Sequence, residues 1–372
     1  MSANRYILTT GGTGGHIFPA IAVARAIQKL EPEADILFVG AKGGMEEKMV
    51  SQAGFSILSV TISGFARKLN LKNLYKNLLF PLKYVLGLWQ ASRILGIFQP
   101  QVVVGFGGFA SAPTLRMALS KNIPSVIHES NAYPGVVNRM VANRVRKVFI
   151  GNEKVKSYLS SSNIYFTGNP IREQLLNGSR EKGLDTWNFT PDQKIVLIIG
   201  GSRGARTINE AVLAGLDKLI ASKIQILWQC GTIYFEEFQS RISHHSQVRL
   251  MPFIENMGDA YACADLVVSR AGAMSIAEIT ALRKPSILIP SPNVAEDHQT
   301  QNARSLTEKG AAILVTDARA KEDLAPTIIE FLGATEKYSN MKLALETYPL
   351  SDAASIIASE IISIANERRG HV

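Results

Sequence analysis

The sequence predicts an α/β fold built from two doubly wound parallel sheets. Short apolar runs rich in Val and Ile, each bounded by Gly or Pro, alternate with helix-length segments along the whole chain. Apolar runs without polar alternation are typical of parallel strands that are buried on both faces. Alternation of such strands with helices predicts parallel sheets covered by helices. Because a chain of 372 residues is too long for one ordinary core, we expect two domains.

Twelve apolar runs are the expected strands, six in each half of the chain. The first six are residues 6–9, 36–39, 57–60, 102–104, 125–127 and 148–150. The other six are residues 195–199, 224–228, 248–250, 266–268, 286–289 and 312–315.

Turn residues mark the expected boundary between the domains. Turn chemistry is concentrated at Thr167-Gly168-Asn169-Pro170. We therefore expect a first domain of residues 1–168 and a second of residues 169–350. A last amphipathic segment, residues 351–368, is followed by no strand. It either caps the second domain or returns to the first, and we expect it to join the first.

Composition narrows the class of protein. The only cysteines are Cys230 and Cys263, and neither lies in a CxxC or Cys/His cluster. This pattern indicates a reducing compartment, two buried thiols, and neither a disulfide framework nor a structural zinc site. The N-terminus enters a strand pattern at once, and no window holds 18 uninterrupted apolar residues. We expect a cytosolic protein without a secretory signal or a spanning helix.

Charge is distributed unevenly along the chain. Residues 1–168 carry 19 Lys and Arg against 7 Asp and Glu, a net charge of +12. The remaining residues carry 21 against 24, a net charge of −3. No acidic residue occurs from Lys48 to His128, whereas nine basic ones do. This asymmetry predicts that the first domain meets an anionic partner, either a membrane surface or a nucleic acid.

Three glycine-rich segments follow expected strands. The first glycine loop, residues 11–15, is followed by His16 and a helical stretch, the second is residues 105–111, and the third is residues 200–206. The dinucleotide fingerprint G-x-G-x-x-G fails because Ile17 stands at its third glycine position. Glycines before a helix start let anionic oxygens approach backbone N–H groups, and the alternative is a tight turn without a ligand.

These loops predict a ligand site because they end parallel strands. In doubly wound sheets, loops at the carboxyl ends of strands converge on one crevice. The third loop adds the hydroxyl of Ser202 and the cations of Arg203 and Arg206, which suit a phosphate.

Two further strand-end segments of the second half carry polar groups. Glu278 follows the small residues of 269–277, and its carboxylate either clamps the diol of a ribose or faces solvent at a helix N-terminus. Residues 296–302 hold clustered acids and amides that suit sugar hydroxyls, and the alternative is a solvated loop.

Six motifs together resemble those of one known family. They are GGTGGHIFPA (11–20), GFGGFAS (105–111), HESNAYPGVVNR (128–139), TGNPIR (167–172), GGSRGAR (200–206) and SRAGAMSIAE (269–278). In order and spacing, along nearly the whole chain, they resemble the MurG family, the lipid II synthases of peptidoglycan synthesis. The resemblance implies the GT-B architecture, in which two Rossmann-like domains face a cleft that holds the active site.

The resemblance also implies a reaction. It is the transfer of N-acetylglucosamine (GlcNAc) from UDP-GlcNAc to lipid I, undecaprenyl-pyrophosphoryl-N-acetylmuramyl-pentapeptide, to give lipid II. The anomeric carbon is inverted, which gives a β-1,4 linkage. Such an enzyme would work at the cytoplasmic face of the bacterial inner membrane.

The same resemblance implies roles for individual residues. Arg172 would approach the diphosphate of the donor. The sugar side of the cleft would be formed by Thr13, Gly14, Gly15 and Asn131. The donor would be contacted by Ser202, Ile254, Glu278 and Gln299, and by the loop residues Ala273, Met274, Ser275 and Ile276 with Ala277 beside them.

Two departures from the family pattern concern the acceptor pocket. Ser130 stands where the family usually has Gln, and Phe109 and Ala110 stand where it usually has Tyr and Pro. They affect the detailed contacts of the acceptor.

Inverting transfer needs a base for the acceptor hydroxyl and a stabilised leaving diphosphate. His16 is the first candidate base because imidazole titrates near neutral pH, and Glu129 competes with it. His128 is placed to orient either one, and a purely structural His16 would act as a hydrogen-bond donor at the helix start. Leaving-group charge would fall on the helix start at Ser202 and on Arg172, so we expect no metal or other cofactor beyond the co-substrate UDP-GlcNAc.

A basic apolar segment, residues 67–89, is the expected membrane contact. Its apolar residues recur at helical spacing with lysines between them, as in interfacial helices. The expected contacts are Leu71, Lys72, Leu74, Tyr75, Lys76, Leu78, Leu79, Leu82 and Lys83. The alternative is a core-facing helix whose lysines reach solvent. We expect Leu74, Leu78, Leu79 and the neighbouring lysines to be exposed on the first domain, where they would meet an anionic phospholipid surface.

Three other functions compete with this one. A UDP-GlcNAc 2-epimerase would share the nucleotide site but would not need the basic apolar segment. A diacylglycerol glycosyltransferase would keep that segment and differ around Asn131. Nucleic-acid binding is disfavoured because the cations are interleaved with aliphatic residues rather than with stacking aromatics.

Overall fold

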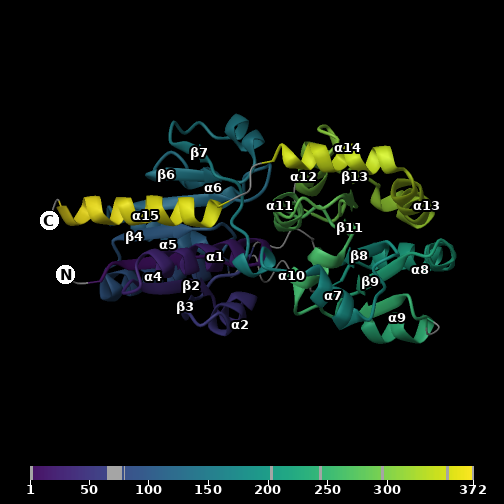
Figure 1. The fold of residues 1–372 in the computed structure, drawn as a ribbon. Coiled ribbons are helices and arrows are strands. Elements are labelled where there is room, and N and C mark those ends of the chain that lie inside the picture. The colour runs from purple at the N-terminus through teal and green to yellow at the C-terminus, as the bar shows by residue number, and fades with distance from the viewer. Residues whose placement is uncertain are drawn as a thin grey trace. The chain divides into compact units, whose positions relative to one another are not determined.

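The structure, a computed structural model, divides the chain into two compact units (Figure 1). It describes residues 3–64, 78, 80–201, 204–242, 245–294, 297–348 and 352–370. Unit 1 is Met1–Ile171 together with Ser351–Val372, and unit 2 is Arg172–Leu350. The expected linker at residues 168–169 lies three residues before the division between the units.

Unit 1 contains a seven-stranded parallel sheet in the order β3-β2-β1-β4-β5-β6-β7. The strands are β1 (Arg5–Thr9), β2 (Asp35–Ala41), β3 (Ser56–Val60), β4 (Val102–Gly105), β5 (Ser125–Glu129), β6 (Lys147–Ile150) and β7 (Ile164–Phe166). The helices are α1 (Gly14–Leu30), α2 (Met45–Gln52), α4 (Phe80–Phe98), α5 (Ser111–Ser120), α6 (Val136–Val141) and α15 (Ala353–Gly370). Strand order reverses between β1 and β4, so the loops after these two strands lie side by side at the switch point.

The side chains of β1 show how this sheet is buried on both faces. Tyr6 and Leu8 pack into one apolar cluster, and Ile7 between them packs into the cluster on the other face. The helix α15 completes the first cluster, because Ile357 and Ile361 pack with residues of α1. The last helix of the chain therefore belongs to unit 1.

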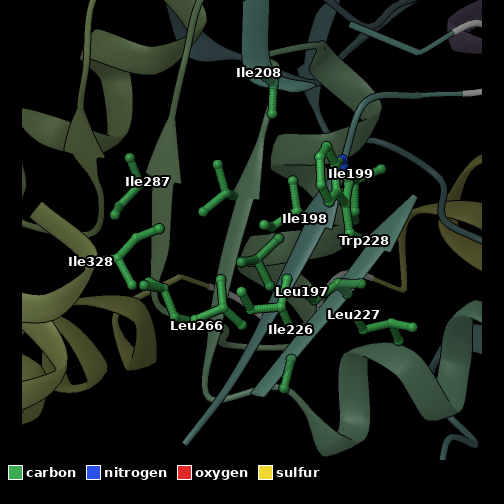
Figure 2. Packing of buried hydrophobic residues seen from close by; sticks show 14 of the residues in the cluster. Leu197, Ile198, Ile199, Ile208, Ile226, Leu227, Trp228, Leu266, Ile287 and Ile328 are labelled. Carbon is green, nitrogen blue, oxygen red and sulfur yellow. The ribbon is translucent and has the colours of Figure 1, made fainter. Parts of the chain in front are cut away.

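Unit 2 contains a six-stranded parallel sheet in the order β10-β9-β8-β11-β12-β13. The strands are β8 (Ile195–Ile199), β9 (Gln225–Gln229), β10 (Val248–Met251), β11 (Leu266–Ser269), β12 (Ser286–Leu288) and β13 (Ile313–Leu314). The helices are α7 (Arg180–Trp187), α8 (Arg206–Ala221), α9 (Phe235–Arg241), α10 (Met257–Cys263), α11 (Ala273–Ala281), α12 (His298–Thr307), α13 (Ala320–Gly333) and α14 (Thr335–Glu346). Figure 2 shows the core of this unit, where Leu197, Ile198 and Trp228 of the central strands meet side chains of the helices.

All twelve expected strands are confirmed, and one strand was missed. That strand is β7, three residues at the edge of the sheet in unit 1. Its Tyr165 and Phe166 are each 44% exposed. An edge strand this short, with exposed side chains, lacks the continuous apolar run by which buried strands are recognised.

The two cysteines behave as expected from the composition. Cys230 and Cys263 are both free and buried. Burial raises the pKa of each thiol to about 11. Within the described ranges, no helix has both the length and the apolar character that crossing a bilayer requires.

Candidate active site

The first and second glycine loops meet at the switch point of unit 1. The first loop connects β1 to α1, with Gly12 in the left-handed region at φ +90°. The second follows β4, and a Cβ on its Gly108 would lie 2.0 Å from the carbonyl oxygen of Gly11. Only a residue without a side chain fits at Gly108, so these two backbones pack directly together.

His16 lies in the first turn of α1, beside the second glycine loop. A Cβ on Gly107 would lie 3.1 Å from Cδ2 of the imidazole, so the ring covers the backbone there. Nδ1 lies 3.3 Å from Oγ1 of Thr13. The ring is half-buried and stands in the first turn of α1, where the backbone N–H of His16 donates to the carbonyl of Thr13 at 3.1 Å. Thr13, Gly14, Gly15 and His16 thus form one contiguous surface.

Glu129 ends β5 and is buried, with both carboxylate oxygens occupied. Oε1 accepts from the backbone N–H of Asn131 at 2.9 Å and from its side-chain Nδ2 at 3.3 Å. Oε2 accepts from the N–H of Gly135 at 2.8 Å and from Nδ2 of Asn138 at 2.9 Å. The carboxylate therefore holds the Asn131 side chain in place, and Asn138, which the sequence analysis did not single out, completes its hydrogen bonds.

His128 is fully buried in the same strand. Burial lowers its pKa to about 4, the nearby charge of His16 acts in the same direction, and a contact with the carbonyl of Gly168 opposes them. Its Nδ1 lies 3.4 Å from Oγ of Ser130, the residue that departs from the family pattern. With this pKa, the imidazole of His128 is neutral near pH 7.

The third glycine loop lies at the switch point of unit 2. A Cβ on Gly204 would lie 2.1 Å from the carbonyl oxygen of Cys230, so glycine lets the loop pack onto the end of β9. The helix α8 begins two residues later at Arg206, and its N-terminus offers backbone N–H groups to an anion. Ser202 and Arg203 lie outside the described residues.

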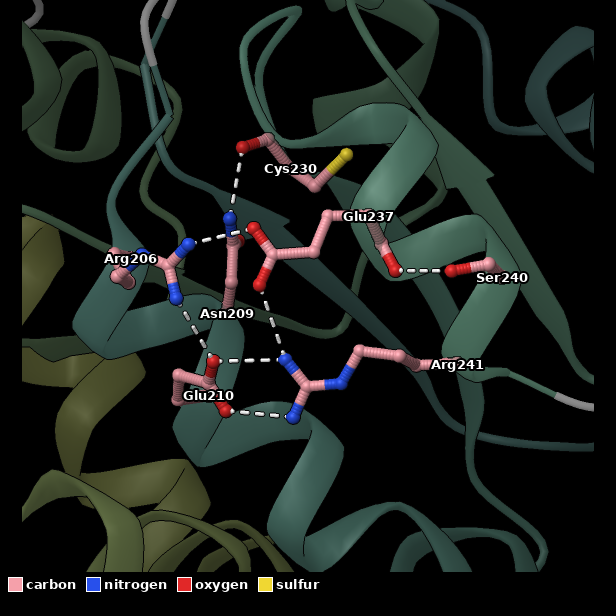
Figure 3. Close-up of polar contacts among 7 residues, drawn as sticks. All are labelled: Arg206, Asn209, Glu210, Cys230, Glu237, Ser240 and Arg241. Atoms are coloured by element: carbon pink, nitrogen blue, oxygen red, sulfur yellow. Dashed lines mark hydrogen bonds and ion pairs between the residues drawn. The ribbon is translucent and has the colours of Figure 1, made fainter.

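Arg206 takes part in an ion-pair cluster between α8 and α9 (Figure 3). Its guanidinium lies 3.3 Å from Oε1 of Glu210 and 2.6 Å from Oε2 of Glu237. Arg241 binds the same two carboxylates, at 2.9 Å and 3.3 Å. Two carboxylates already neutralise the charge of Arg206. This ion pairing competes with the expected role of Arg206 as a phosphate contact.

Glu278 lies in the second turn of α11 and is buried. Its Oε1 lies 3.4 Å from Nη2 of Arg172, and its Oε2 accepts from the hydroxyl of Tyr261 at 2.9 Å. Burial raises the pKa of this carboxyl, and Arg172 and Tyr261 both lower it in part. The alternative in which Glu278 faces solvent is wrong.

The two side chains that contact Glu278 make contacts that the sequence did not predict. Arg172, expected beside a diphosphate, makes its ion pair with Glu278 of the same unit. Tyr261 lies in α10, 17 residues before Glu278. A tyrosine within an apolar helix gives no sequence signal of a polar contact.

The remaining residues predicted to contact the donor lie around the same switch point or on the adjoining elements. Residues Ala273–Ile276 form the first turn of α11 and are not a loop, contrary to expectation. Met274 and Ala277 are largely buried, whereas Ser275 and Ile276 are half-buried.

Backbone contacts fix two of the predicted residues outside α11. Ile254 is buried, and its N–H donates to Oε1 of Gln229 at 3.0 Å. Gln299 lies in the first turn of α12, where its Oε1 accepts from the N–H of Ser291 at 2.8 Å. The side-chain amide of Gln299 is therefore held in one orientation.

The expected membrane contact falls partly on α4. Leu78, two residues before α4, is 74% exposed. On α4 itself, Leu82 is 70% exposed and Lys83 is half-buried. Val85, Leu86 and Trp89 are further exposed apolar residues of this helix. The other expected contacts, Leu71, Lys72, Leu74, Tyr75, Lys76 and Leu79, lie outside the described residues.

Comparison with known proteins shows which protein family the chain is related to. Residues 6–150 match the glycosyltransferase family 28 N-terminal domain, and residues 195–357 match the family 28 C-terminal domain. The UDP-N-acetylglucosamine--N-acetylmuramyl-(pentapeptide) pyrophosphoryl-undecaprenol N-acetylglucosamine transferase of Bacteroides fragilis is 43% identical over 98% of this chain and 97% of its own length. The crystal structure of Acinetobacter baumannii MurG has a TM-score of 0.75 at 25% identity, covering 97% of this chain and 99% of that one. The chain belongs to the MurG family.

Membership of the MurG family confirms the predicted GT-B class of two parallel-sheet α/β domains. A UDP-N-acetylglucosamine 2-epimerase has a TM-score of 0.65 at 14% identity, over 99% of this chain and 98% of that one. At 14% sequence identity, this structural similarity shows a shared fold and does not show a shared activity.

Proposed function

We propose that this protein is an inverting transferase that moves GlcNAc from UDP-GlcNAc to lipid I and so makes lipid II in peptidoglycan synthesis. The observation that carries this proposal is the relation at 43% identity, over nearly the full length of both chains, to a transferase named for that reaction. The glycine loops and the buried Glu278 supply chemistry that suits it.

Unit 2 is the proposed donor site. The ribose diol of UDP donates to the Glu278 carboxylate, which Arg172 and Tyr261 hold from either side. The diphosphate lies at the N-terminus of α8, where helix-end N–H groups stabilise negative charge. Charge that develops on the leaving diphosphate falls on these donors and on Arg172, so the reaction requires no metal or other cofactor. Turnover that is unchanged after treatment with a chelator is the expected result.

Unit 1 is the proposed acceptor side. His16 acts as the base that takes the proton of the acceptor hydroxyl, since its ring stands at the open start of α1. Glu129 is the weaker candidate because four donors already fill its two oxygens. Glu129 instead holds Asn131, whose amide meets the sugar together with Thr13, Gly14 and Gly15.

Unit 1 also supplies the proposed membrane surface. The exposed apolar residues of α4 enter the interface of the membrane, and the lysines of residues 67–89 meet anionic phospholipid headgroups. We propose that the protein works at the cytoplasmic face of the bacterial inner membrane, with a lipid-linked acceptor and no nucleic-acid partner.

Acceptor dependence separates this function from that of the epimerases. The protein is incubated with UDP-GlcNAc alone, and then with a short-chain lipid I analogue or with a diacylglycerol, while the donor is followed by NMR. We expect no change in the donor without acceptor or with diacylglycerol, and UDP release with the lipid I analogue. Conversion of UDP-GlcNAc to its 2-epimer without acceptor would refute the proposal, as would transfer to diacylglycerol.

A further inference from the structure

A buried carboxylate lies beneath the first glycine loop. Glu46 is the second residue of α2 and has no solvent-exposed surface. Its Oε1 accepts from the N–H of Ala41 at 2.8 Å, and its Oε2 accepts from the N–H of Gly12 at 3.3 Å. The residue thus joins the end of β2 to the loop that follows β1.

Three glycines make room for this one side chain. A Cβ on Gly11 would lie 2.3 Å from Oε1 of Glu46, and one on Gly44 would lie 2.5 Å from either oxygen. A Cβ on Gly40 would lie 2.5 Å from Cγ. These separations are shorter than any van der Waals contact, so no other residue fits at these positions while Glu46 keeps its place. The backbone of two strand ends is shaped around the carboxylate.

Burial of a carboxylate is unfavourable unless hydrogen bonds or opposite charge compensate it. Here the backbone donors of Ala41 and Gly12 and the N-terminal end of α2 supply that compensation. The hydrogen bond from the N–H of Gly12 to Glu46 also fixes the peptide of Gly12, whose φ of +90° is left-handed. Thr13, the start of α1 and His16 follow directly.

We propose that Glu46 is a positioning residue for the first glycine loop. Its carboxylate holds the Gly12 peptide so that Thr13, Gly14, Gly15 and His16 keep the geometry needed for transfer to the acceptor. The inference rests on the proposed function, because it assigns the loop to the transfer step. The proposed role of Glu46 concerns unit 1 and makes no claim about the donor site in unit 2.

The test compares Glu46→Gln with Glu47→Gln as the matched control. Glutamine keeps the shape of glutamate but turns an N–H donor towards a backbone N–H. Glu47 is the next residue of α2 and binds Gly43 and Ser59, away from the loop. We expect Glu46→Gln to lower kcat by about 10- to 100-fold while the KM for UDP-GlcNAc and the Kd for UDP stay within about twofold. Glu47→Gln should leave all three unchanged.

Hydrogen exchange provides a readout that does not depend on transfer. Faster amide exchange in the peptide that contains residues 11–16 is expected in Glu46→Gln, with the rest of unit 1 unchanged. If the wild-type protein transfers no GlcNAc but this exchange still accelerates, the proposed function fails and the positioning role stands. Unchanged exchange with an unchanged kcat would overturn the role, and so would an equal loss of UDP affinity.

A second variant serves if Glu46→Gln does not fold. Gly12→Ala leaves the carboxylate in place and strains the loop, because alanine disfavours a φ of +90°. Among the described residues, its Cβ would meet the ring of Phe109, at 3.4 Å, and no other side chain within 4 Å. In Gly12→Ala we expect kcat to fall as in Glu46→Gln, while the KM for UDP-GlcNAc and the Kd for UDP change little. A Gly12→Ala protein with wild-type kcat would show that the loop geometry does not govern transfer.

Discussion

Three buried carboxylates organise the candidate sites of the two units, one in unit 2 and two in unit 1, and each is held by a different set of donors. Glu278 is held by a tyrosine hydroxyl and an arginine, Glu129 by two asparagines and two backbone N–H groups, and Glu46 by backbone N–H groups alone. The donors that fill Glu129 and Glu46 leave them to shape backbone and neighbouring side chains. Among the three, Glu278 is held by one hydroxyl and one cation, so its two oxygens keep acceptor capacity for a ribose diol.

Replacement of His16 by alanine tests the proposed base. Proton transfer by a positioned side chain contributes about 10²- to 10⁴-fold to a rate, so kcat should fall by that factor. The Kd for UDP, measured by calorimetry, should not change, because the proposed donor contacts lie in unit 2. An alanine variant with undiminished turnover would dismiss His16 as the base and return attention to Glu129.

Replacement of Tyr261 by phenylalanine tests the ribose clamp. The hydrogen bond from Tyr261 lowers the pKa of Glu278, which burial raises, so its loss moves that pKa further upwards. Because the ionised carboxylate accepts from the ribose, the acid limb of the pH profile of kcat/KM should move to higher pH. Loss of a hydrogen bond to a charged group should also raise the KM for UDP-GlcNAc by about tenfold at pH 7.

Tyr348→Phe is the matched control for the ribose clamp. It removes a hydroxyl that donates to the backbone carbonyl of Ser305 in the same unit. It should leave the acid limb where it is in the wild-type protein. An unshifted limb in Tyr261→Phe, or an equal shift in the control, would contradict the role of the tyrosine.

At the level of elements, apolar runs predicted the strands because strands buried on both faces must be apolar throughout. The same reasoning missed β7, whose aromatic residues are partly exposed. Contacts such as Tyr261 with Glu278, or Glu46 with Gly12, join residues far apart in the chain through single polar atoms. No periodic pattern accompanies them, and only the folded structure brings them together.

The exposed face of α4 carries the prediction about the membrane. Leu82→Glu combined with Val85→Glu places two carboxylates on that face, where both native side chains are well exposed. Since full burial of each apolar side chain contributes about 1.5–3 kcal/mol, co-sedimentation with phosphatidylglycerol-containing vesicles should weaken by at least about tenfold. Transfer to a water-soluble acceptor analogue should not change.

Leu343→Glu is the control for the membrane prediction. Leu343 is equally well exposed, but it lies on α14 of unit 2. This variant should bind vesicles as the wild-type protein does. Equal vesicle binding by the α4 double variant and the wild-type protein would refute the proposed membrane surface.

At the level of the whole molecule, each apolar core cluster among the described residues lies within one unit. The buried core of unit 2 is built from residues 175–345. In unit 1, one cluster is built from residues 6–149 and 357–365, and the other from residues 7–159. The sequence indicated two domains and the return of the last helix to the first. It did not specify which residues of that helix are buried, because both of its flanks carry apolar side chains.

Replacement of Ile361 by alanine tests this division of the cores. Ile361 is fully buried against unit 1, so its truncation should reduce the unfolding free energy of unit 1 by about 2–5 kcal/mol. Calorimetry should show a lower unfolding temperature for one transition only, and UDP should raise the other. Ile356→Ala, on the exposed side of the same helix, should change neither transition. A shift of both transitions in Ile361→Ala would contradict two separate cores.

The central claim is the transfer of GlcNAc to lipid I. The most direct measurement incubates the protein with UDP-GlcNAc labelled in the sugar and with a short-chain lipid I analogue, and quantifies UDP and the labelled lipid together. We expect one β-1,4-linked disaccharide on the lipid for each UDP released. Release of UDP without a disaccharide product would contradict the claim.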